Sequence, residues 1–174
     1  SSDLHTPSPQ ERAIAHVTAH AEGDPIDPSH RVTLHFHPDR LAAGRPILEV
    51  MARDGVYRSQ FETGTSNGAL TAHPGGSRWR WESRIFGGAY DHAPPSERPK
   101  YGALNYRRRR HGASPRFGSA HLRLKPETLD RTTFCHPDSV FEPSDFGVAA
   151  RGSALLALAA ATPAADALDD YIEA

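Results

Sequence analysis

Residues 31–38 read Arg31-Val32-Thr33-Leu34-His35-Phe36-His37-Pro38, and this stretch decides the β part of the fold. β-Branched and aromatic residues favour extended backbone, and a proline ends a strand because it has no N–H to donate. The stretch therefore predicts a strand that ends before Pro38. Because side chains alternate along a strand, we expect His35 and His37 to lie on one face.

Helices are predicted at both chain ends. Ser8-Pro9-Gln10-Glu11 combines an N-cap serine, a proline at the first helical position and the glutamate of a capping box, which predicts a helix over residues 8–22. The Ala- and Leu-rich tail over residues 153–174 is also predicted to be helical, with Thr162-Pro163 starting a second short helix.

The central region, residues 30–140, supplies the rest of the expected sheet. Residues 56–62 alternate like a second strand, and further strands are expected at residues 119–124 and 132–134. Residues 47–52 fit either a strand or a short helix, while residues 75–118, rich in Gly, Pro and Arg, predict long irregular loops. We expect a single α+β domain over residues 1–174, with a mixed, mainly antiparallel sheet.

Composition excludes several classes of protein. With 20 basic and 21 acidic residues among 174, the chain has no overall attraction for nucleic acid or an anionic membrane, and we expect neither as a partner. The single Cys135 cannot form an internal disulfide or a zinc site built on cysteine pairs. The apolar run at residues 154–161 is too short to span a bilayer. The basic run at residues 107–110 fits a solvated loop or a docking patch for an acidic partner.

Two histidines and an arginine are candidates for ligand binding near the first strand. His35 and His37 on one face could bind a metal, but no second His or Asp cluster has diagnostic spacing, so we expect no metal site. Alternatively, one histidine bonds a sugar hydroxyl while Arg40 contacts a phosphate, or one is a buried structural histidine.

Glu62 is the carboxylate with the most informative surroundings. On a strand, Gln60 and Glu62 would share a face, beside the hydroxyl-rich string at residues 63–68. A carboxylate there could bond a ribose hydroxyl and stabilise the positive charge that develops as a C1′–N bond breaks. The alternative is a turn carboxylate that accepts hydrogen bonds from the amides of Gly64 and Thr65.

Four strings of glycine, aromatic and charged residues, at 60–68, 86–91, 98–105 and 114–119, indicate a nucleotide or phosphorylated ligand, although tight turns would need the same glycines. Five partly overlapping strings carry a family resemblance: HFHPDR at 35–40, YRSQFETGTSNG at 57–68, FGGAYD at 86–91, RPKYGALN at 98–105 and PRFGS at 115–119. In this order the strings resemble the CteC-like family of bacterial effectors. The resemblance covers about residues 30–140.

The resemblance implies a mono-ADP-ribosyltransferase that uses NAD to modify a threonine of host ubiquitin. It implies an ADP-ribosyltransferase-like split sheet, a monomer, and a secreted effector that acts in the host cytoplasm. Glu62 would be catalytic, with Glu82 as another possible carboxylate for that role. The residues expected to bind NAD are His35, His37, Arg40, Gln60, Thr65, Ser66, Asn67, Tyr101, Arg116 and Ser119.

Two other functions remain open at the level of sequence. One is a metal-dependent phosphoesterase that uses His35 and His37 as ligands. The other is a noncatalytic module whose arginine-rich run at residues 107–110 docks an acidic partner.

Overall fold

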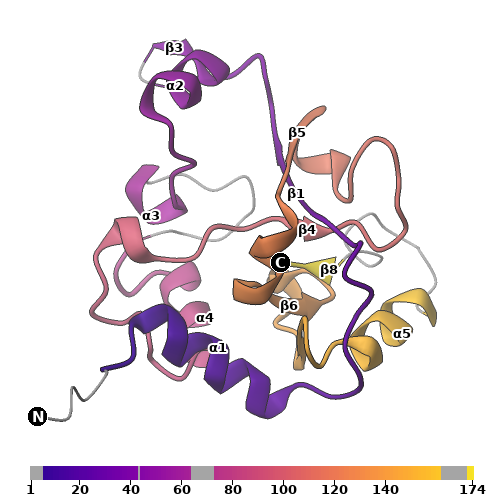
Figure 1. Cartoon of the computed structure of the whole chain (residues 1–174). Coiled ribbons are helices and arrows are strands. Elements are labelled where there is room, and N and C mark those ends of the chain that lie inside the picture. The colour runs from indigo at the N-terminus through magenta and orange to yellow at the C-terminus, as the bar shows by residue number, and fades with distance from the viewer. Residues whose placement is uncertain (1–5, 43, 64–72, 162–171) are drawn as a thin grey trace, which may run out of the picture.

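The strand expected at residues 31–37 is present as β1 (Val32–Phe36), inside an antiparallel sheet (Figure 1). The computed structural model describes residues 6–42, 44–63, 73–161 and 172–174. Within them, six strands pair in the order β5-β1-β4-β8-β6-β7, and every pair is antiparallel. Besides β1, the sheet contains β4 (Ala103–Leu104), β5 (Ala120–Arg123), β6 (Thr133–His136), β7 (Asp145–Val148) and β8 (Ile172–Glu173), of which β4 and β5 pair directly with β1. The protein is therefore of the mixed α+β class.

Helices lie between and around these strands. The α-helices of the described residues are α1 (Pro9–His20), α2 (Ile47–Asp54), α3 (Gln60–Thr63), α4 (Ser77–Ile85) and α5 (Ser153–Ala161). The 3-10 helices are η1 (Pro95–Glu97), η2 (Pro115–Phe117), η3 (Pro126–Arg131) and η4 (Ser139–Phe141). A small hairpin, β2 (Leu41–Ala42) and β3 (Arg45–Pro46), leads into α2. In these parts of the chain, no helix has the length and apolar character needed to cross a bilayer.

Both faces of β1 are buried, each by a different part of the chain. Val32 and Leu34 belong to the larger apolar core, which also contains Phe134 of β6. On the opposite face, the Thr33 hydroxyl accepts a hydrogen bond from the N–H of Ala113 at 3.1 Å. The segment at residues 112–118 therefore covers the polar face of this strand, which explains why both faces are buried.

Helix α1 forms as predicted at the N-terminal end. Its N-cap, Ser8, accepts from the N–H of Glu11 at 3.1 Å, and the Glu11 carboxylate accepts from the N–H of Ser8 at 3.0 Å. This capping box fixes the first turn. Val17 packs the helix into a second apolar cluster, together with Phe86 and Val148.

The alternating segment at residues 56–62 is not a strand, and that prediction was wrong. Its last residues form the one-turn helix α3. The N–H of Glu62 donates to Ser59 Oγ at 3.2 Å, and the N–H of Ser59 donates to the Glu62 carboxylate at 2.6 Å. This capping box outweighs a period-two pattern only a few residues long. Positions 60 and 62 are therefore about 200° apart around the helix axis, not two residues apart on a strand.

Residues 75–118 contain less loop than the sequence predicts, because α4 occupies Ser77–Ile85. The buried side chains of this helix are Arg78, Trp81 and Glu82. Two of the three are charged, so the buried face gives no apolar stripe at helical spacing. That is why the helix escaped detection from the sequence.

Other expectations are resolved by the same structure. The ambiguous segment at residues 47–52 is helical and ends at Gly55, whose φ is 66°. The strands near residues 119–124 and 132–134 are present as β5 and β6, and the first helix of the tail as α5. The short helix predicted after Thr162-Pro163 lies outside the described residues. The prediction of a helical tail up to residue 174 was wrong at its end, because Ile172–Glu173 form β8 and pair with β4 and β6 in the sheet.

Candidate active site

His35 is a buried histidine with both ring nitrogens engaged. Its Nδ1 lies 2.8 Å from the carbonyl oxygen of Gly118, and the N–H of Ser114 donates to its Nε2 at 3.2 Å. These contacts select the neutral tautomer with hydrogen on Nδ1. Burial lowers the pKa of His35, which favours the neutral ring. His35 therefore fastens the segment at residues 112–118 to β1 and has no ring nitrogen left for a metal or a cofactor.

His37 does not continue the strand, since β1 ends at Phe36. It is partly buried and starts a turn in which the N–H of Arg40 donates to its carbonyl oxygen at 3.1 Å. Among the described residues, no group of three or more His, Cys, Asp or Glu side chains is placed to hold a metal ion. The two-histidine metal site would need a free nitrogen on His35, which the structure assigns to the protein's own hydrogen bonds.

Three glycines near β1 allow close packing: Gly102 and Gly118 from the strings, and Gly112 between them. A Cβ on Gly102 would collide with Leu34, one on Gly112 with His35, and one on Gly118 with the carbonyl of Phe36. Glycine at these positions lets neighbouring segments lie directly against β1. For these three residues, the structure supports a packing role over a phosphate cradle.

Four of the expected NAD-binding residues gather at the Phe36 end of β1. β5 pairs with β1 through Phe36 and Ala120, which places Ser119 beside this end. The 3-10 helix η2 contacts β1 and carries the exposed Arg116. Exposed Arg40 and partly buried His37 follow from the strand itself. The grouping offers guanidinium and hydroxyl donors in one region.

Glu62 lies in a different group, on the single turn of α3. One carboxylate oxygen, Oε2, accepts the N–H of Ser59, while Oε1 lies 3.6 Å from Nη1 of Arg58. The side chain is 13% exposed, so solvent reaches it. Glu62 is thus the carboxylate of a capping box whose N-cap is Ser59, while the Gly64 and Thr65 amides that the alternative interpretation invoked lie outside the described residues. Thr65, Ser66 and Asn67 lie outside the described residues, and Gln60 begins the helix.

A buried network of charged groups adjoins α3. Arg98 Nη1 donates to Glu82 Oε1 at 3.0 Å, and the Tyr101 hydroxyl donates to Glu82 Oε2 at 2.8 Å. Glu82 is fully buried, and burial raises its pKa to about 7. Burial also raises the pKa of Tyr101 well above its usual range. Tyr101, expected to bind NAD, instead bonds Glu82 and has the Arg78 guanidinium 4.1 Å from its ring centre.

The network continues to the centre of the sheet. Arg78 Nη1 donates to Ser139 Oγ at 3.1 Å, and Ser139 Oγ donates to Glu173 Oε1 of β8 at 2.9 Å. The Cys135 thiol donates to Glu173 Oε2 at 3.3 Å. Burial raises the pKa of Glu173 to about 7. Arg78, Arg98 and Glu173 were missed by sequence reasoning as a cluster, since no local motif relates three positions so far apart.

The arginine run at residues 107–110 is an exposed turn. The Asn105 side chain stabilises this turn: it accepts a hydrogen bond from the N–H of Arg109 at 3.0 Å and donates one to the Arg109 carbonyl oxygen at 2.8 Å. Arg108 Nη2 bonds Asp27 at 3.1 Å and Ser29 at 2.7 Å. A docking role for this turn stays a prediction.

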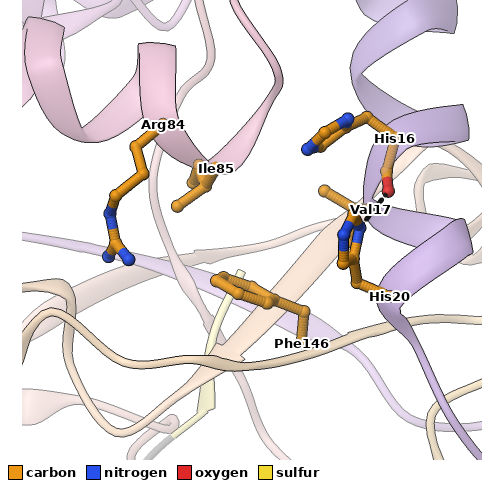
Figure 2. A pocket seen from close by; sticks show the side chains of 6 residues that line it. All are labelled: His16, Val17, His20, Arg84, Ile85 and Phe146. Carbon is orange, nitrogen blue, oxygen red and sulfur yellow. Dashed lines mark hydrogen bonds between the residues drawn. The ribbon is translucent and has the colours of Figure 1, made fainter.

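A small pocket of about 100 Å³ lies between α1, the end of α4 and β7 (Figure 2). Figure 2 shows the rings of His16 and His20 on one side, Arg84 and Ile85 on the other, and Phe146 between them. His20 Nδ1 donates to the carbonyl of His16 at 2.8 Å. None of the residues expected to bind NAD lines this pocket.

The fold and the candidate site together define a small α+β protein with one antiparallel sheet and a buried ionic network beside a solvent-accessible glutamate. The chain belongs to the family described as "Protein of unknown function (DUF3626)", whose model matches residues 31–171. No curated protein shows significant similarity to the chain.

Proposed function

We propose that this protein is an NAD-dependent mono-ADP-ribosyltransferase that modifies a threonine hydroxyl of ubiquitin. The resemblance of the five strings to the CteC-like effectors supports the reaction and the acceptor. It also supports a split-sheet ADP-ribosyltransferase fold, a monomer, and secretion into a host cell. NAD is a substrate of this reaction, and we expect it to require no metal.

The orientation of Glu62 is the observation that carries the proposal. Its Oε2 is fixed by the Ser59 amide at 2.6 Å, while Oε1 lies near Arg58 and the side chain remains accessible. A carboxylate held in one position stabilises a positive charge better than a mobile one, because it needs no reorganisation during the reaction. Glu62 therefore suits a reaction in which positive charge develops on a sugar carbon.

The residues at the Phe36 end of β1 would contact the rest of the substrate. Arg40 and Arg116 are exposed residues, and a guanidinium group matches phosphate oxygens in geometry and charge. His37 and Ser119 offer further hydrogen-bonding groups in the same region. His35 and Tyr101 are not proposed to contact NAD, because their polar side-chain atoms form hydrogen bonds within the protein. They stabilise the structure around the proposed site instead.

The proposed reaction is a substitution at C1′ of the ribose. The C1′–N bond breaks and its electron pair leaves with nicotinamide, while Glu62 stabilises the oxocarbenium character at C1′. The threonine oxygen then forms a bond to C1′ and releases its proton to solvent water. No covalent intermediate with the protein is needed.

Mass spectrometry of ubiquitin incubated with this protein and NAD tests the proposal. We expect a gain of one ADP-ribose, mapped to a threonine. Glu62→Gln should lower transfer by about 100-fold or more, because the charge is lost. Glutamine can still accept the Ser59 amide in a capping box, so the fold is kept.

Glu49→Gln is the matched control, since Glu49 is an exposed helical glutamate paired with Arg45 at 2.9 Å. It should transfer at the rate of the parent protein. Unmodified ubiquitin with the parent protein would overturn the proposed function, and full activity of Glu62→Gln would remove Glu62 from catalysis.

A further inference from the structure

Arg98 occupies the junction between the Glu62 helix and helix α4. Its guanidinium carbon lies 4.2 Å from the ring centre of Phe61 and 6.0 Å from that of Trp79. The residue is 5% exposed, so the guanidinium is almost completely removed from water. A flat cation stacked on an aromatic ring gains strength when both are desolvated. The Arg98 guanidinium thus stacks on Phe61, the residue immediately before Glu62.

The segment that carries Arg98, residues 95–98, also contacts the start of α3. The hydroxyl of Ser59 donates to the carbonyl of Pro95 at 2.6 Å. Ser59 is fully buried, and its backbone N–H is the group that orients the Glu62 carboxylate. Residues 95–98 therefore touch α3 at two points, one at the cap and one at Phe61.

Glu82 fixes Arg98 in turn. The Arg98–Glu82 contact of 3.0 Å is buried on both sides, with side-chain exposures of 4% and 0%. The Tyr101 hydroxyl holds the other oxygen of Glu82. Because each carboxylate oxygen of Glu82 has a fixed partner, the guanidinium has a defined direction when it meets Phe61.

Helix α3 depends on such contacts, since it spans only Gln60–Thr63. A single helical turn is unstable in isolation, because ordering its backbone costs more than one hydrogen bond returns. We propose that Arg98, fixed by Glu82, is a positioning residue that sets the Glu62 carboxylate in its reactive orientation. This inference rests on the proposed function for its catalytic consequence, but the positioning itself can be measured without any reaction.

Arg98→Lys is the main test. Lysine keeps the positive charge but lacks the flat guanidinium that stacks on Phe61. Hydrogen–deuterium exchange of the Ser59 and Glu62 amides reports the integrity of the cap directly. We expect both amides to exchange about 10-fold faster or more than in the parent protein, because local opening becomes easier.

Steady-state transfer kinetics give the second readout. A displaced carboxylate should lower kcat by about 10-fold or more, while KM for NAD changes by less than about 2-fold. A general loss of structure would alter both constants. Arg84→Lys is the matched control, because Arg84 lies on α4, stacks on Trp81 at 4.8 Å and is outside the network. It should leave both amides and kcat unchanged.

The outcomes separate this inference from the proposed function. Faster exchange with a lower kcat supports both, and faster exchange with no transfer by the parent protein supports positioning while refuting the function. Unchanged exchange in Arg98→Lys, or unchanged kcat despite faster exchange, overturns the inference. If Arg98→Lys fails to fold, Phe61→Leu removes the stacked ring without disturbing the buried ion pair and is read in the same way.

Discussion

Replacing Glu82 by glutamine should change how the stability of this protein depends on pH. Glu82 is fully buried and accepts hydrogen bonds from Arg98 and Tyr101. Burial is the largest influence on this carboxyl and outweighs both partners, raising its pKa from 4.5 to about 7. The unfolded chain loses this burial, so its Glu82 carboxyl titrates near the ordinary value.

The sign and size of the effect follow from the two pKa values. Between pH 4.5 and about 7 the folded protein keeps a proton on Glu82 that the unfolded chain has released. The contribution of this proton to stability is complete below pH 4.5 and lost as the pH rises through about 7. The gap between the two pKa values corresponds to roughly 3 kcal/mol in the free energy of unfolding. Glutamine at this position does not titrate and lacks this loss.

Urea unfolding of the parent protein and Glu82→Gln from pH 4 to 8.5 measures the effect. The free energy of unfolding of the variant, minus that of the parent, should rise by roughly 3 kcal/mol across this range. Glu173 titrates in both proteins, so its contribution cancels in the difference. A difference that stays constant would refute the burial argument, and one that falls would show that the Arg98 charge dominates.

Four further changes, one of them at a comparison glycine in open space, test the packing around β1 and the cap of α1 by urea unfolding. Gly118→Ala should lose about 3 kcal/mol or more, because its Cβ would collide with the Phe36 carbonyl at a φ of 145°. Gly75→Ala, at a φ of 77° with open space around it, should lose about 1–2 kcal/mol, and equal losses at the two glycines would contradict the packing account. Ser8→Ala should lose about 1 kcal/mol with the capping bond, and an unchanged stability would show that the cap is dispensable. His35→Ala should lose roughly 3 kcal/mol, because it leaves a cavity and unpaired backbone groups, and a loss below about 1 kcal/mol would argue against its fastening role.

Local signals in the sequence were reliable where one element satisfied them by itself. Ser8 and Glu11 cap α1 through contacts three residues apart, so the sequence alone predicts that helix. The same Ser-x-x-Glu pattern occurs at Ser59 and Glu62, inside a segment whose alternation predicts a strand. A capping box depends on two specific hydrogen bonds, whereas alternation over a few residues also arises by chance.

Distant contacts account for what the sequence did not reveal. The partners of Glu82 come from residues 16 and 19 positions further along the chain, and Arg78 meets Ser139 across 61 positions. No spacing rule connects such residues, because they are brought together by the turns between α4 and β4 and by the sheet itself. From the sequence alone, the glycines beside β1 fit a ligand-binding loop as well as close packing. Only the positions of the neighbouring segments decide between the two.

The buried network is better explained by the orientation that it gives to its side chains than by a gain in the free energy of unfolding. Removing two guanidiniums and two carboxylates from water costs several kcal/mol for each ion, and apolar side chains of similar size commonly give equal or greater stability. Moreover, Nε of Arg78 is buried with no hydrogen-bond partner in the described residues, which by itself costs about 1–3 kcal/mol. A hydrogen-bonded pair of arginine and glutamate fixes the relative direction of its two side chains as well as the distance between them, whereas apolar contacts do not fix direction. Arg98 lies where that direction matters, between Glu82 and the helix that carries Glu62.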